Sequence, residues 1–450
     1  TMKSSEAAQH EYETQILDNQ RLFCQSIVNA ISNYMKCLIH SDTYDLESTF
    51  SIIGLWFDYS YAEFKPFIQE VPDLIPVMEE YFDEINATKF VSLFYQLAAR
   101  VDDIGEISST QSDDYNSAFQ NFLKTMVKSI SQKCPMECFP ILYALMNNDR
   151  TQSPIQTVNK KKIDAIKQIV YSITFVSDEL KQMWKENKLL LNTYIRFGET
   201  PAMSKSHSSC TKLSQLGAKY MLDINAESMP FATIVTSSRN VAISHFEDKI
   251  SILNGVNKPI LLNIVGTDGH LYKQILKANK DDLRQDAVMQ QLFILASTLL
   301  SRKNHDFSIR HYKVVPLSPT VGLIEFVENS ISIQDYIWTI NNNSKTDGGA
   351  ITRYYTDGPN ASMNFREALS RFATESTKYH KQPKPQDKDL KALVKCFVDI
   401  RSKLKPVFKF FFIEKFQNSA DWFVSRLRYA QHCATNSIVG HILGIGDRHL

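Results

Sequence analysis

The sequence lacks the features of a disulfide-stabilised protein and of a membrane-spanning one. Its seven cysteines are an odd number at low density, which is unlike a disulfide framework and favours a reducing compartment. No apolar run is long enough to cross a bilayer, because Lys409, Glu414 and Lys415 interrupt even the richest one, at 406–416. These absences exclude a small secreted scaffold and a transmembrane helix as the basis of the fold.

A dominant charge of one sign is also absent. The formal net charge is +1, so bulk electrostatics does not indicate a nucleic-acid or acidic partner. Cys134 and Cys138 resemble half of a zinc site, but no second Cys/His pair stands at zinc spacing. The start at Thr1-Met2 carries no secretory signal, and we expect the sequence to be an internal piece of a longer one.

Residues 1–200 are dominated by helical periodicity. Apolar residues recur at helical spacing in four stretches, separated by prolines and polar segments: Leu22–Leu38, Phe90–Val101, Phe119–Ile130 and Ile163–Val176. Short amphipathic helices joined in this way predict a helical-repeat array or a bundle. No fixed repeat period is present, so any repeat is degenerate.

After about Pro230 the pattern changes to that of strands. Runs rich in β-branched residues, bounded by turn residues, predict strands at 231–236, 250–255, 258–266, 270–277, 310–318 and 322–327. Asp268-Gly269 predicts a hairpin turn between the third and fourth of these. A long helix is predicted from Asp282 to about Lys303.

The remainder of the chain is predicted to be mostly helical. Helices are expected within Leu390–Phe416 and from Asp421 to about Gly444, whereas 341–360 reads as a loop and 381–389 as a polar linker. A β-rich lobe followed by an α-rich lobe is the arrangement of a bilobal kinase, although many α+β proteins share it.

The first candidate site residues lie around the long helix. Lys277 ends a predicted strand, and the following helix opens with Asp281, Asp282 and Asp286. Such a pair of elements can form an ion pair that aims the ammonium at nucleotide phosphates. The alternative is a solvated lysine followed by acids that favour the helix N-terminus.

Two weaker signals flank this region. Gly255 and Pro259 belong to a connection between strands whose amides can cradle phosphate, or which is an ordinary hairpin loop. The strand containing Glu325, Phe326 and Val327 leads into the helical lobe, as a kinase hinge does, but its composition equally fits a buried strand.

The last candidate is the triplet Asp447, Arg448 and His449. It supplies a carboxylate, a permanent cation and a titratable donor, the groups that phosphoryl transfer requires. The triplet is common by chance, and its weight comes from following Lys277, the acidic helix and the hinge-like strand in chain order.

Six stretches together resemble the phosphatidylinositol-3-kinase-related protein kinases, and they span nearly the whole chain. They are LFYQLAARVDD, FPILYALMNNDR, KDDLRQDAVMQQLF, YKVVPLSPTVGLIEFV, KPVFKFFFIEKF and SIVGHILGIGDRHL. The resemblance implies a FAT-type α-solenoid and connecting helices over 1–200, a kinase N-lobe of small antiparallel sheet plus long helix over 201–327, and the start of a C-lobe over 328–450. The expected fold class is therefore α plus α+β, with a C-lobe that ends inside the catalytic loop.

The same resemblance implies roles for the candidate residues. Lys277 is the phosphate-binding lysine, Asp286 its partner, Asp281 a second polar contact, and Tyr312 a wall of the adenine pocket. Phe326 would share that pocket, with the main chain of Glu325–Val327 as the hinge. Because KANKDD is one residue longer than the family pattern, Lys280 remains an alternative to Lys277.

For the catalytic triplet, the resemblance implies that Asp447 is the catalytic aspartate, with Arg448 beside it, and that His449 reaches the γ-phosphate. The magnesium ligands, the activation loop and the FATC segment are expected beyond Leu450. Residues 1–450 alone are accordingly expected to be inactive and poorly soluble.

The resemblance further implies a nuclear, homodimeric serine/threonine protein kinase that uses ATP and Mg²⁺ in double-strand-break signalling and telomere maintenance. Its substrates would carry Ser/Thr-Gln sites, and an end-processing nuclease complex would recruit it, so that it meets DNA ends indirectly and no membrane. Two alternatives remain open at this point: a lipid kinase of the same superfamily, and a catalytically inactive FAT-kinase scaffold.

Overall fold

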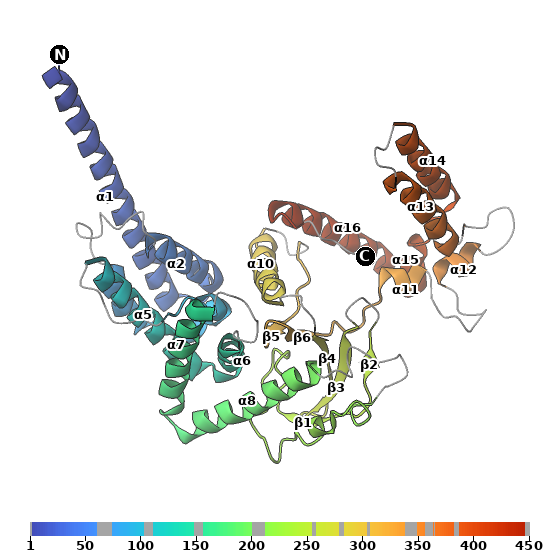
Figure 1. The fold of residues 1–450 in the computed structure, drawn as a ribbon, viewed down its shortest axis with the longest axis horizontal. Helices are drawn as coiled ribbons and strands as arrows, with labels where there is room; N and C mark the ends of the chain where they lie inside the picture. Colours follow the sequence, from blue (N-terminus) through green and yellow to red (C-terminus); the bar gives the residue numbers. More distant parts are fainter. Residues whose placement is uncertain are drawn as a thin grey trace. The chain divides into compact units, whose positions relative to one another are not determined.

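The computed structural model of the chain describes most of the sequence (Figure 1). The described residues are 2–60, 74–102, 111–147, 156–199, 212–253, 258–278, 283–303, 307–337, 349–355, 363, 365–381 and 387–445. They divide into two compact units. The first comprises Thr1–Leu295 with Arg310–Phe326, and the second comprises Ala296–Ile309 with Val327–Leu450.

The N-terminal part of the first unit is a helical array, as its apolar spacing predicts. The array consists of α1 (Met2–His40), α2 (Asp45–Ser60), α3 (Leu74–Phe82), the 3₁₀-helix η2 (Ala87–Leu93), α4 (Phe94–Ala98), α5 (Gln111–Lys133), α6 (Pro135–Met146), α7 (Gln156–Thr174) and α8 (Asp178–Gly198). The predicted stretch from Phe90 to Val101 is divided between η2 and α4 rather than forming one helix. Its apolar residues Phe90, Phe94 and Leu97 are nevertheless fully buried.

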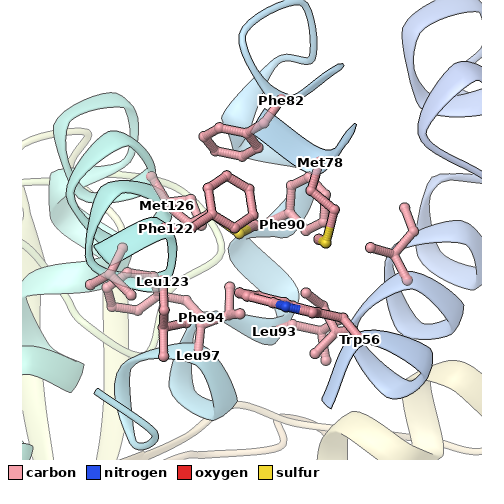
Figure 2. Packing of buried hydrophobic residues seen from close by; sticks show 14 of the residues in the cluster. Trp56, Met78, Phe82, Phe90, Leu93, Phe94, Leu97, Phe122, Leu123 and Met126 are labelled. Atoms are coloured by element: carbon pink, nitrogen blue, oxygen red, sulfur yellow. The ribbon is translucent and has the colours of Figure 1, made fainter. Parts of the chain in front are cut away.

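Aromatic side chains fill the core of this array (Figure 2). The ring centroid of Trp56 lies 4.8 Å from that of Phe119 and 5.4 Å from that of Phe122. Phe82 meets Phe122 edge-on, with the rings at 88°. Since rings in tilted and edge-on contact bury large areas in favourable quadrupole geometry, these aromatic residues hold α2, α3 and α5 together.

The C-terminal part of the first unit is an antiparallel sheet with one long helix. The strands follow the order β1-β3-β4-β6-β5, and β2 pairs with β3. Their bounds are Ile243–Phe246 for β1, Ser251–Ile252 for β2, Ile260–Gly266 for β3, Leu271–Ala278 for β4, Val314–Pro316 for β5 and Val321–Glu325 for β6. Helix α10 (Leu283–Ser301) follows β4, in agreement with the predicted long helix.

Helix α8 of the array lies along one face of this sheet (Figure 1). Leu190, Leu191 and Tyr194 of α8 share one buried cluster with Leu262, Leu276 and Leu323 of the sheet. The array and the sheet are therefore joined by a common apolar core.

One strand prediction is wrong, because 231–236 is not a strand. Within this segment a single isolated bridge joins Thr233 to Ala242. Ala232, Ile234 and Val235 are buried, and a turn follows at once, since Ser237 N–H donates to Ile234 O at 2.9 Å. The β-branched residues fill the core beside the sheet without extending its ladder.

The second unit is helical in its described residues, apart from short connections. It contains the end of α10, α11 (Ile333–Ile337), α12 (Ala350–Tyr355), α13 (Phe365–His380), α14 (Asp387–Lys403), α15 (Lys409–Lys415) and α16 (Ser419–Ile442), and a turn follows α16. Helix α12 contradicts the predicted loop over 341–360. Tertiary packing overrides the turn-rich sequence there, because Ala350 is buried and Tyr354 stacks on Phe410 with centroids 3.7 Å apart.

Among the described helices, none combines the length and apolar character that a membrane span requires.

Candidate nucleotide-binding site

The two faces of the sheet differ in burial, and this difference locates the site. Along β4, Gln274 and Leu276 are fully buried beneath α8, whereas Lys273, Ile275 and Lys277 are half-buried on the opposite face. Neighbouring strands continue that open face, since Ile275 pairs with Ile324 of β6 and opposing residues of an antiparallel pair point to the same side. A ligand that uses this sheet therefore has to lie on the Lys277 face.

Lys277 and Asp286 are brought together as the sequence predicts. Nζ of Lys277 on β4 lies 4.0 Å from Oδ2 of Asp286 on the first turn of α10. The lysine side chain is 22% exposed and the aspartate side chain 53% exposed. A partly exposed pair at this distance contributes about 0–1 kcal/mol to stability, so its chief effect is to orient the ammonium group.

A close contact between helix and sheet fixes the start of α10 beside this pair. Gly322 of β6 stands opposite Lys277, and the side chain of buried Leu283 packs onto it. A Cβ on Gly322 would lie 2.5 Å from Cδ1 of Leu283 and 3.0 Å from the carbonyl oxygen of Val315. The glycine therefore lets the first turn of α10 approach the sheet at the level of Lys277.

Tyr312 lies near the same carboxylate. Burial raises the pKa of the Tyr312 phenol, and the negative charge of Asp286 raises it further. The backbone N–H of Tyr312 donates to Oε1 of Gln290 at 3.0 Å, which ties the approach to β5 to the middle of α10. The proposed adenine-pocket tyrosine and the proposed lysine partner are thus neighbours.

The side chains at the hinge-like end of β6 point to different faces of the sheet. Glu325 pairs with Gln274, so its side chain points to the α8 side of the sheet, away from the Lys277 face. Its Oε2 accepts from the backbone N–H of Lys313 at 2.9 Å. A contact with adenine from Glu325 would therefore have to use its main chain. Phe326 meets Lys273 of the open face, whose Nζ lies 5.4 Å from the ring centroid, and Val327 begins the second unit.

The ends of the candidate phosphate loop are closed by a hydrogen bond. The backbone N–H of Leu253 donates to the carbonyl oxygen of Pro259 at 2.8 Å. Lys258 has φ of 41°, a conformation that non-glycine residues seldom adopt and that clusters at ligand-binding segments. Gly255 lies outside the described residues.

Six other candidates also lie outside the described part of the chain: Lys280, Asp281, Asp282, Asp447, Arg448 and His449. The choice between Lys277 and Lys280 accordingly rests on the observed pairing of Lys277 with Asp286. Over the described residues, no group of three His, Cys, Asp or Glu side chains is placed to hold a metal ion.

Sequence reasoning missed a buried polar chain that supports β4. The Tyr194 hydroxyl of α8 donates to Oε1 of Gln274 at 2.7 Å, and Nε2 of Gln274 donates to Oγ1 of Thr236 at 2.9 Å. The signal was a glutamine at a core position of a strand whose next inward residue is Leu276. A buried amide requires partners, and those partners lie 80 and 38 residues away in the sequence.

Comparison with known proteins finds a kinase family that is similar to the part of the chain that carries this site. The sequence model of the phosphatidylinositol 3- and 4-kinase family matches residues 272–450. This part of the chain is therefore similar to phosphatidylinositol 3- and 4-kinase domains. The matched region begins on β4, and it includes Lys277, α10 and the Asp447–His449 triplet.

Curated relatives extend the likeness over nearly the whole chain. The serine/threonine-protein kinase ATM of Arabidopsis thaliana is 30% identical over 436 residues, which cover 93% of this chain and 10% of that protein. The serine/threonine-protein kinase tel1 of Schizosaccharomyces pombe is 26% identical over 436 residues, 94% of this chain and 14% of that protein. The chain thus spans about a tenth to a seventh of these relatives.

Solved structures show the same fold. The FAT and kinase domain of CtTel1 matches with a TM-score of 0.77 at 23% identity, covering 99% of this chain and 29% of that one. The complete CtTel1 dimer with C2 symmetry matches with a TM-score of 0.74 at 24% identity, covering 99% of this chain and 16% of that one. A helical array followed by a sheet-containing kinase lobe is therefore the fold of this chain, as expected from its sequence.

Proposed function

We propose that the protein to which this chain belongs is an ATP-dependent serine/threonine protein kinase. The observation that carries the proposal is the coincidence of the kinase-family match with the Lys277–Asp286 pair on the open face of the sheet. The family match alone leaves protein and lipid substrates open. The likeness of the preceding helical array to relatives named serine/threonine-protein kinases favours a protein substrate.

The domain limits of the proposal follow the sequence reading. A FAT-type array and connecting helices would occupy 1–200, the N-lobe 201–327, and the beginning of the C-lobe 328–450. The shared apolar core between α8 and the sheet supports treating the array as a structural part of the kinase rather than as a separate module.

The residues of the open face fit a nucleotide in their chemistry. Lys277 offers a cation beside apolar Ile275 and Ile324, and such a face suits a polyphosphate joined to a planar base. ATP with Mg²⁺, when bound, supplies the phosphoryl group and neutralises its charge. Lys277 would hold the phosphates, Asp286 would orient Lys277, and Tyr312 with Phe326 and the main chain at Val327 would border the base.

The remaining roles belong to the triplet. Asp447 would orient the acceptor hydroxyl and receive its proton, and His449 would donate toward the γ-phosphate, with Arg448 adding positive charge. Gly255 and Pro259 would place backbone amides near the phosphates, and Asp281 would add a polar contact.

The finer biology of the proposal rests on the ATM and tel1 relatives. We expect substrates with Ser or Thr followed by Gln, action in double-strand-break signalling and telomere maintenance, recruitment by an end-processing nuclease complex, and a nuclear location. Homodimerisation is supported by the likeness to a dimeric CtTel1 structure.

The test uses the complete protein, purified from cells and incubated with Mg²⁺ and radiolabelled ATP. A Ser-Gln peptide should be labelled, whereas the matched Ala-Gln peptide should not. Lys277→Ala should abolish most of the labelling, and Lys303→Ala, an exposed lysine just after α10, should leave it unchanged. Labelling of phosphatidylinositol vesicles instead of the peptide would indicate a lipid kinase, and no transfer to either would indicate an inactive scaffold.

A further inference from the structure

Helix α10 is held mainly by polar contacts rather than by an apolar core. Of its described residues, Leu283 and Gln290 are the buried ones. Leu283 anchors the first turn on Gly322, but the rest of the helix is half-buried or exposed. The position of its middle turns must therefore be fixed in another way.

A cavity separates α10 from the helical array along much of its length. It encloses about 510 Å³ and is lined by α6, by the segment 235–238, by β5 and by α10 itself. Met136 and Ile141 of α6 and Ala287 and Ile294 of α10 are among the residues that line it. Tight side-chain packing is thus missing where it would otherwise set the distance between the array and α10.

Two adjacent glutamines make the polar contacts in this region. Gln290 accepts the backbone N–H of Tyr312 and so ties α10 to the sheet. Gln291 ties α10 to the array, because its Nε2 donates to the carbonyl oxygen of Ser92 at 3.0 Å and its side-chain amide is hydrogen-bonded to that of Gln96. Ser92 and Gln96 belong to η2 and α4.

The geometry of the helix links this contact to the candidate site. Gln291 lies five positions after Asp286, which places their side chains about 140° apart around the helix axis. Asp286 therefore faces Lys277 while Gln291 faces the array. A displacement of Ser92 and Gln96 would move α10 as a body and change the separation of Asp286 from Lys277.

We propose that Gln291 is a positioning residue, through which the helical array sets α10 and thereby the Lys277–Asp286 pair. The inference rests on the proposed kinase function and adds to it a route by which the array controls nucleotide binding. Gln291 itself contacts neither the nucleotide nor the acceptor. Its effect is expected in the KM for ATP more than in kcat, because the pair it adjusts holds phosphates already in the ground state.

The experiment compares three variants of the complete protein in the peptide assay. Gln291→Leu keeps the side-chain volume but removes the hydrogen bonds, and it should raise the KM for ATP about three- to tenfold. Gln96→Leu, which lies outside the kinase domain, should raise the KM in the same direction. The matched control is Gln285→Leu, a substitution of an exposed glutamine on the same helix, and its KM should stay at the wild-type value.

A double-mutant cycle then separates positioning from general damage. If Gln96 and Gln291 act through one contact, the double variant should be less impaired than the product of the two single effects. A wild-type KM in Gln291→Leu, multiplicative effects in the double variant, or an equal loss in Gln285→Leu would overturn the inference. Absence of ATP-dependent transfer in the wild-type protein would instead overturn the proposed function.

Discussion

Tyr194→Phe is the sharpest test of how the array supports the nucleotide-binding strand. The Tyr194 hydroxyl is the α8 end of the buried chain that continues through Gln274 to Thr236. Tyr194 and Gln274 are both 0% exposed, and Thr236 is 3% exposed. Removing one oxygen atom changes the packing volume little, so the consequence is almost wholly polar.

The magnitude follows from what the substitution leaves behind. Oε1 of Gln274 would lose its 2.7 Å donor in a site closed to water. An unsatisfied buried acceptor costs about 1–3 kcal/mol. The edge-on contact between the rings of Tyr194 and Phe246, with centroids 5.9 Å apart, does not involve the hydroxyl and should persist.

Hydrogen exchange of the β4 amides, followed by mass spectrometry on the complete protein, measures this loss locally. If opening of β4 separates Gln274 from α8, a loss of about 1–3 kcal/mol accelerates exchange of Leu271–Ala278 about 5- to 150-fold. Tyr171→Phe is the matched control, since Tyr171 is 70% exposed and its substitution should leave exchange unchanged. If the β4 amides of Tyr194→Phe exchange within about twofold of the wild-type rate, the reasoning is refuted. Leaving a buried acceptor without a donor should cost more free energy than a twofold change represents.

Three further predictions concern the array, the cavity and the catalytic triplet. Trp56→Ala should destabilise the array by about 3–5 kcal/mol, measured by exchange of α2 and α5 amides, because it empties the centre of the aromatic core. Desolvation lowers the pKa of Lys313, against the opposing effects of Glu137 and Glu325, and because the residue is still exposed, solvent screening keeps the consequence for stability small. Protonated Lys313 therefore costs stability below its folded pKa, and the cost vanishes as the pH rises toward the unfolded value. Lys313→Met should accordingly melt at a higher temperature than wild type near pH 7, by a margin that shrinks toward about pH 10. Asp447→Asn in the complete protein should lower kcat with little change in the KM for ATP, and an unchanged kcat would assign Asp447 a structural role.

The parts of the fold that the sequence predicted correctly are those encoded by local periodicity. β3, β4 and α10 were found because their apolar residues alternate or recur within a few positions, and the Asp268-Gly269 turn joins the first two. Residues 231–236 carry the same β-branched composition, but their pairing is limited to the isolated bridge between Thr233 and Ala242 and does not extend into a ladder. Composition reports that a segment is buried, whereas the ladder that makes it a strand depends on chain segments elsewhere.

The candidate site divides in the same way. Lys277 and Asp286 could be paired from the sequence because the end of a strand and the start of the helix that follows it lie close together when the connection between them is short. The orientation of Glu325 required the register with Gln274, which the sequence does not state. The tie between Gln96 and Gln291 spans 195 residues, and no local pattern distinguishes Gln291 from exposed Gln285 on the same helix.

The boundary of the family match and the boundary of the folded unit do not coincide. The match begins at residue 272, inside β4, whereas β3, which pairs with β4 along its length, ends at Gly266. Helix α8 covers the face of β4 that carries Gln274 and Leu276. Tyr194 is hydrogen-bonded to Gln274, and the leucines of α8 pack in one cluster with Leu276 and Leu323. A polypeptide that began at residue 272 would expose this apolar face and the unpaired edge of β4 to water, and both are costly. The phosphate-binding lysine proposed here therefore depends for its position on residues from α8 onward, so the helical array belongs to the physical structure of the site.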